Sequence, residues 1–123
     1  MGTNFNIGVR LAIYKGFGVT HYGIYSGSGM VVDNSNVRGC VQERPLSEFA
    51  GGRQVRAVPI NSKYLPHEVV ERARSQKGKP YGWLSQNCEH FVNEIQLGVP
   101  KSAQALVGGS LLALGLYRLV SSK

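Results

Sequence analysis

Cys88 and His21 are the residues of this sequence whose types could together perform nucleophilic catalysis. Cys88 follows Asn87 at the start of a predicted helix, where unpaired amides and the helix dipole favour a thiolate. The same amides can bind the oxyanion of an acyl-transfer reaction. His21 lies in a predicted strand over 20–26, and an imidazole close to the thiol could take its proton and return it to the leaving group. Each residue alone is more often structural, but together they predict a cysteine-dependent acyl-transfer enzyme.

A third residue should orient the imidazole through its second nitrogen. The Ser-Gly-Ser-Gly run at 26–29 predicts a hairpin turn after the histidine strand. With a three-residue loop, His21 faces Asp33 across the hairpin, whereas a two-residue loop slips the register by one and places Asn34 there. An aspartate would also stabilise an imidazolium. We therefore favour Asp33 as the orienting residue, with Asn34 as the alternative.

The elements that must position these residues are short strands followed by helices. Val, Ile and aromatic residues between glycines predict strands over 7–14, 20–26, 30–33 and 54–60, with a further extended stretch over 38–42. One helical turn is expected over 45–49, and helices are expected over 66–77 and from 87 to 98. This order predicts the α+β class, with a small antiparallel sheet packed on helices.

The end of the chain differs in composition from the rest. Residues 103–120 contain only three strongly polar side chains, and as a helix this stretch could nearly span a bilayer. It could be a membrane span, an interfacial helix, a core helix or a protein-contact surface. Flanking lysines and several small residues favour membrane association. We therefore divide the chain into a catalytic domain over 1–102 and a hydrophobic C-terminal segment over 103–123.

Net charge and cysteine content indicate which binding partners and which cellular compartment are expected. The net charge of +7 would attract an acidic lipid surface. Nucleic acid is not expected, because the basic residues are scattered singly and are not interleaved with stacking aromatics. Cys40 and Cys88 are too few for a disulfide framework, so a cytoplasmic location is expected. The cysteines and histidines lack a recognised ligand spacing, so neither a metal nor another cofactor is expected.

Two motifs resemble the lecithin:retinol acyltransferase family. The segment Thr-His-Tyr-Gly-Ile-Tyr-Ser-Gly at 20–27 resembles that family's catalytic-histidine strand, and Asn-Cys-Glu-His-Phe-Val at 87–92 resembles its nucleophile motif. Intervening and trailing positions also match the family's spacing, so the resemblance runs from about residue 8 to residue 102. It implies a circularly permuted papain-like fold related to the NlpC peptidases, in which the histidine precedes the cysteine.

The resemblance also implies a reaction and a substrate class. Family members include phospholipases A, retinol acyltransferases and phospholipid N-acyltransferases, so Cys88 would attack a lipid ester, form a thioester and transfer the acyl group to water or another acceptor. Members often carry a second histidine where this chain has Asp33, and the loop between His21 and Cys88 is shorter here. Tyr25 and Tyr81 are candidates for lining the substrate pocket, although packed aromatics are commoner.

Two other functions stay open from the sequence. A peptidase or amidase would use the same thiol on an amide, and a membrane-associated binding protein could keep the fold without catalysis. The apolar C-terminal segment favours a phospholipid or other acyl-lipid substrate at a membrane surface. The oligomeric state is not predicted.

Overall fold

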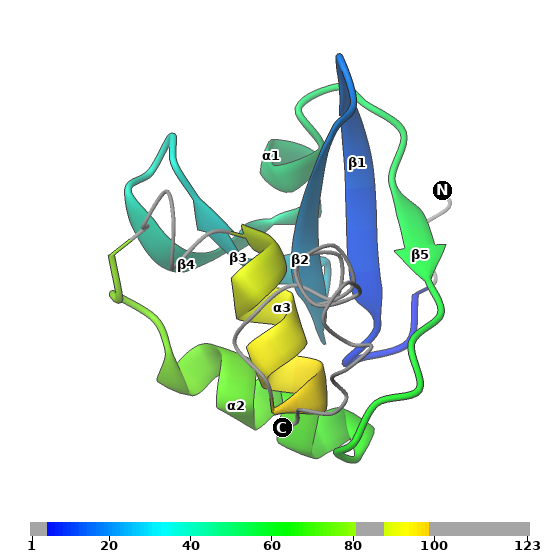
Figure 1. Ribbon diagram of the computed structural model, residues 1–123, viewed down its shortest axis with the longest axis vertical. Helices are drawn as coiled ribbons and strands as arrows, with labels where there is room; N and C mark the ends of the chain where they lie inside the picture. The colour runs from blue at the N-terminus through cyan, green and yellow to red at the C-terminus, as the bar shows by residue number, and fades with distance from the viewer. Residues whose placement is uncertain (1–4, 81–87, 99–123) are drawn as a thin grey trace, which may run out of the picture.

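A five-stranded antiparallel sheet forms the centre of the computed structural model, which describes residues 5–80 and 88–98 (Figure 1). The strand order is β4-β3-β2-β1-β5. The strands are β1 (Arg10–Gly16), β2 (Val19–Gly27), β3 (Met30–Ser35), β4 (Cys40–Pro45) and β5 (Arg56–Val58). The helices are α1 (Leu46–Ala50), α2 (Pro66–Ser75) and α3 (Cys88–Leu97). The predicted α+β class and antiparallel sheet are confirmed.

Both faces of the sheet are buried, because apolar side chains occupy alternate and adjacent strand positions alike. One face packs against α2 and α3, as the front of Figure 1 shows. Its core comprises Ile24, Val32, Val41, Val69, Ala73, Phe91, Val92 and Ile95. The other face packs against Phe49 of α1, with a core of Leu11, Ile13, Tyr25, Val31 and Phe49. Neighbouring residues on β2 and β3 therefore pack into different cores, on opposite faces of the sheet.

The helices begin and end near their predicted residues. Pro66 opens α2 after Leu65, whose amide donates to the Glu68 side chain at 2.9 Å. Gly51, with a φ of 57°, ends α1, and Gly98, with a φ of 77°, follows α3. The helix predicted over 66–77 ends two residues earlier, at Ser75.

The neighbouring strands β1 and β5 both differ from the prediction. β1 begins at Arg10, because Gly8 has a φ of 82° and turns the chain before the strand. β5 has only three residues, although the sequence predicted a strand over 54–60. Pro59 follows it directly and has no amide to extend the ladder with β1.

Some predictions concern residues outside the described ranges. The helix cap at Asn87, the pocket residue Tyr81 and the segment over 103–123 all lie there. The division into 1–102 and 103–123 therefore stays a prediction. Within residues 5–80 and 88–98, no helix is both long enough and apolar enough to cross a bilayer.

Candidate active site

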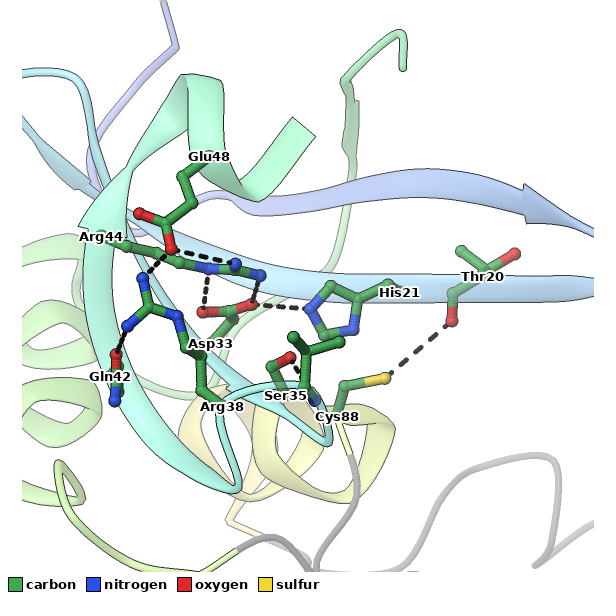
Figure 2. A network of polar contacts seen from close by, with 10 residues as sticks. Thr20, His21, Asp33, Ser35, Arg38, Gln42, Arg44, Glu48 and Cys88 are labelled. Carbon is green, nitrogen blue, oxygen red and sulfur yellow. Dashed lines mark hydrogen bonds and ion pairs between the residues drawn. The ribbon is translucent and has the colours of Figure 1, made fainter. Parts of the chain in front are cut away.

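His21 on β2 and Asp33 on β3 form a buried polar pair (Figure 2). His21 Nε2 lies 2.6 Å from Asp33 Oδ2, and the two residues are 8% and 1% exposed. A carboxylate in this position accepts the Nε2 proton and leaves Nδ1 free to face another group. The contact therefore fixes both the tautomer and the orientation of the imidazole.

The register that brings these residues together differs from the predicted one. Asp33 pairs with Gly23, not with His21, because Ser28 and Gly29 form the turn and a bulge interrupts the ladder between Tyr25 and Gly27. The predicted register was thus wrong by two residues. A shift of two keeps both side chains on one face, and they meet as diagonal neighbours. Asn34, one position along, belongs to the opposite face.

Gly23 makes room for this arrangement. A Cβ atom at this position would lie 2.6 Å from Val31 Cγ1 and 2.9 Å from Phe49 Cε1. It would also lie 3.2 Å from Asp33 Cβ. Without a side chain there, the ring of Phe49 packs 5.4 Å from the His21 ring, measured between centroids. The glycine of the histidine strand is therefore needed for close packing around the pair.

Cys88 is the first residue of α3 and reaches the beginning of β2. Its Sγ lies 3.9 Å from the carbonyl oxygen of Thr20, the residue before His21. Figure 2 shows the sulfur beside the His21 ring, on the side of the nitrogen that does not face Asp33. A hydrogen bond between Cys88 and His21 also contributes to the titration of the imidazole. Thiol, imidazole and carboxylate therefore lie in the order that nucleophilic catalysis requires.

The environment of His21 favours its protonated form. Burial by itself lowers the pKa of His21, since a charged ring loses hydration there. Hydrogen bonds to Asp33 and Cys88, together with the charges of both groups, outweigh burial and raise the pKa above its ordinary value. The site can therefore stabilise the imidazolium that forms when His21 accepts the thiol proton.

Two arginines fix α3, and with it Cys88, against the sheet and α2. Arg10 of β1 donates from Nε to Gln96 Oε1 at 2.7 Å and from Nη2 to Asn93 Oδ1 at 2.9 Å. Arg72 of α2 donates to the carbonyl oxygens of Ile95 and Glu94 at 3.0 and 2.8 Å. The Glu94 carbonyl also accepts a bond from the Gly98 amide at 3.0 Å, so Arg72 adds a second donor at the end of α3. The helix that carries the thiol is thus anchored through its C-terminal half.

Arg44 of β4 is part of the site, and sequence reasoning missed it. Its Nε donates to Asp33 Oδ1 at 3.1 Å and its Nη2 to Oδ2 at 2.6 Å, so the carboxylate is held at both oxygens. Arg44 also forms an ion pair with Glu48, which is bonded in turn to Arg38 (Figure 2). In the sequence Arg44 is one basic residue among many scattered ones. Only the pairing of β3 with β4 reveals its role.

Tyr25 lies away from His21 and Asp33, at the other end of β2. Its hydroxyl accepts a hydrogen bond from the Gly29 amide at 3.0 Å, and its ring packs edge-on against Phe5. Tyr25 is buried in the core beneath α1. The structure does not bring it to Cys88 or His21, so its pocket-lining role is a prediction that no contact supports. No cluster of three His, Cys, Asp or Glu side chains in the described part of the chain could hold a metal ion.

Comparisons with known proteins show what the chain is similar to. A family model described as Lecithin retinol acyltransferase matches residues 3–101. The human protein named Phospholipase A and acyltransferase 2 is 34% identical over 126 residues, covering 81% of this chain and 75% of that protein. Mouse and human proteins named Phospholipase A and acyltransferase 3 are each 30% identical, covering 84% and 89% of this chain and 83% of either relative.

Proposed function

The chain belongs to the lecithin retinol acyltransferase family, and from this premise we propose that it is a thiol-dependent acyltransferase or phospholipase A. Its substrates would be phospholipids or other acyl-lipid esters, and Cys88 would carry the acyl group. The single observation that supports this most strongly is the series Cys88, His21 and Asp33. In that series, a buried 2.6 Å contact orients the imidazole toward the thiol.

In the first half-reaction, the acyl group moves from the lipid ester to Cys88. His21 Nδ1 takes the thiol proton as Cys88 Sγ attacks the ester carbonyl carbon. Amides at the start of α3 can stabilise the oxyanion that forms. When the intermediate collapses, the ester C–O bond breaks and the leaving alcohol takes the proton back from His21. The products are an acyl-thioester on Cys88 and a lysolipid.

The second half-reaction reverses these roles. A water molecule, an alcohol or an amine gives its proton to His21 and attacks the thioester carbonyl, and the C–S bond then breaks. The thiolate of Cys88 recovers a proton from His21, and the product is a fatty acid or an acylated acceptor. Asp33 stabilises the imidazolium, while Arg44 holds the carboxylate in place. Arg44 is thus a positioning residue.

The proposal includes the finer features that family membership suggests. The fold would be a circularly permuted papain-like one, because the histidine strand precedes the cysteine helix in the chain. Asp33 would take the place of the second histidine that many members carry. The enzyme would work at a membrane surface, with the segment over 103–123 as one point of attachment.

The test is to identify what becomes attached to Cys88. Purified protein is incubated with phospholipid vesicles and, separately, with a peptide library, and the covalent adduct is read by mass spectrometry. We expect an added fatty acyl group on Cys88 and release of lysolipid. Cys88→Ala should lower turnover at least about a thousandfold, and Cys40→Ala is the matched control. Phospholipid turnover that survives Cys88→Ala would overturn the proposal, and adducts formed only with peptides would indicate an amidase.

A further inference from the structure

The turn between β1 and β2 exposes an unusual amount of apolar surface. Phe17 at its tip is 104% exposed, and Tyr14 and Val19 on either side are 57% and 52% exposed. Val37, in the turn between β3 and β4, is 77% exposed. These four residues, which we call the apolar rim, make none of the core contacts that would explain their hydrophobicity.

The backbone of the first turn keeps Phe17 in this position. Gly16, Phe17 and Gly18 have φ angles of 95°, 54° and 78°. Glycine adopts such values freely, but a residue with a side chain loses about 1 kcal/mol there. The Gly18 amide donates to the Tyr14 hydroxyl at 3.0 Å and closes the turn. The chain therefore places a large aromatic side chain at a strained position and directs it into solvent.

The apolar rim lies at the same end of the sheet as the candidate active site. Val19 leads directly into Thr20, whose carbonyl contacts Cys88, and into His21. Since β2 and β3 are antiparallel, the turn after β3 lies at the end where β2 begins. Figure 1 shows the β1–β2 turn extending beyond the rest of the sheet, at the opposite side of the molecule from α2. A surface that bound the rim would also meet the catalytic thiol.

The charges in the two turns have one sign. Lys15 lies next to the tip of the first turn, and Arg38, which is paired with Glu48, lies next to Val37 in the second. Neither 14–20 nor 36–39 contains an Asp or Glu. Exposed aromatic and aliphatic side chains combined with lysine and arginine are the composition that binds the interface of an anionic bilayer.

We propose that the apolar rim inserts into the interface of an anionic phospholipid bilayer and brings Cys88 to the level of the ester groups. This inference rests on the proposed function, because it assigns the contact through which the enzyme meets its substrate. It adds a docking surface within the catalytic domain, separate from the segment over 103–123.

Fluorescence tests the insertion without depending on catalysis. Phe17→Trp is made in the full chain together with Trp83→Phe and Cys88→Ala, and the protein is mixed with vesicles of phosphatidylcholine and phosphatidylserine. We expect a blue shift and quenching by brominated acyl chains. Leu65→Trp in the same background is the control, since Leu65 is 59% exposed and precedes α2 at the far end. An unshifted Phe17→Trp spectrum with vesicle-bound protein would overturn the proposal.

Turnover gives the second test. Phe17→Asn removes the ring and keeps a residue that tolerates a positive φ. We expect the ratio of turnover on vesicles to turnover on dispersed short-chain phospholipid to fall about tenfold, while Leu65→Asn leaves that ratio unchanged. An equal loss on both substrates would mean that Phe17 does not dock. If the wild-type protein turns over neither substrate, the proposed function fails, and the fluorescence result alone decides the docking surface.

Discussion

Two arginine–carboxylate pairs each have one member on β4 but have different surroundings. Asp33 and Arg44 have side chains that are 1% and 10% exposed, beneath α1. Glu43 and Arg74 have side chains that are 13% and 49% exposed, at the edge of α2. Glu43 and Arg44 are adjacent in β4, and strand alternation sends them to opposite faces. The same pair of charged groups is thus built twice, once in the interior and once at the surface.

The outer pair serves to connect elements. Glu43 accepts hydrogen bonds from Ser26 Oγ at 2.6 Å, Arg74 Nη2 at 2.9 Å and Lys77 Nζ at 3.1 Å. Partial burial alone would raise the pKa of Glu43, but the bonds from Arg74, Ser26 and Lys77 lower it to about 2. This carboxylate therefore joins β2 and β4 to α2 and stays ionised near neutral pH.

The inner pair has a different consequence. Its carboxylate is almost completely removed from water, which costs free energy that a hydrogen-bonded guanidinium offsets only in part. One oxygen, Oδ2, is shared between Arg44 Nη2 and His21 Nε2. The surface pair of Glu43 and Arg74 therefore supports the fold, whereas the buried pair of Asp33 and Arg44 is suited to holding an imidazole in one orientation.

The largest expected difference between the two pairs comes from removing the carboxylate of the inner pair. Asp33→Asn should lower kcat/KM on phospholipid about a hundredfold or more, because a neutral amide cannot stabilise the imidazolium charge and can hold the imidazole in the other tautomer. It should also destabilise the fold by about 3 kcal/mol, since Arg44 keeps a buried charge without its main partner. Steady-state kinetics and urea unfolding measure the two effects.

Glu43→Gln is the matched control and should leave kcat/KM within about twofold of wild type. If Asp33→Asn fails to fold, Asp33→Asn with Arg44→Met removes both charges and restores a measurable protein. Equal kinetic losses for the Asp33 and Glu43 variants would abolish the distinction between the two pairs.

A smaller effect is expected from removing the guanidinium of the inner pair. Arg44→Met leaves the full charge of Asp33 to act on His21, so the pKa of His21 should rise further. The acid limb of the kcat/KM profile, where the base becomes protonated, should then move to higher pH. Activity at neutral pH should fall about tenfold. A pH series of initial rates measures both.

Arg44→Lys keeps a positive charge but loses the two-point contact, so its acid limb should stay near that of wild type. Arg74→Met, at the outer pair, should not move the limb at all. A shift with Arg74→Met as large as that with Arg44→Met would show that general charge, not contact with Asp33, controls the titration.

The smallest effect is the pH dependence of stability at the outer pair. Because the pKa of Glu43 is lowered from 4.5 to about 2, its contribution is present above pH 4.5 and is lost as the pH falls toward 2. Glu43→Gln should therefore cost about 1 kcal/mol at neutral pH and almost nothing near pH 2. Urea unfolding at several pH values checks this, and an equal cost at every pH would contradict it.

The sequence was enough to predict the class of the fold and the elements that carry the thiol and the imidazole. Apolar alternation, glycine-rich turns and the residues that begin and end helices are local signals, and they predicted β2, β3 and α2 closely. Cys88 and His21 could be selected because their side-chain chemistry is rare and their local positions are informative. The outer strands were predicted less well, since pairing with a neighbour decides where an edge strand stops.

The strand register that relates Asp33 to His21 could not be predicted from local sequence signals. Counting outward from the turn predicted the residue that contacts His21 but gave the wrong register, because a bulge between Tyr25 and Gly27 cannot be read from turn composition. Asp33 remained on the His21 face only because the error was an even number of residues.

The amino-acid sequence by itself determined the candidate reactive residues and the secondary structure that holds them, because both depend on residue type and near neighbours. Tertiary structure alone decided the partners of Asp33, the place of Arg44 and the exposure of Phe17 in the turn before the histidine strand. These depend on strand register and on which surfaces other elements cover. Such relations join residues that are distant in the chain, and no local pattern encodes them.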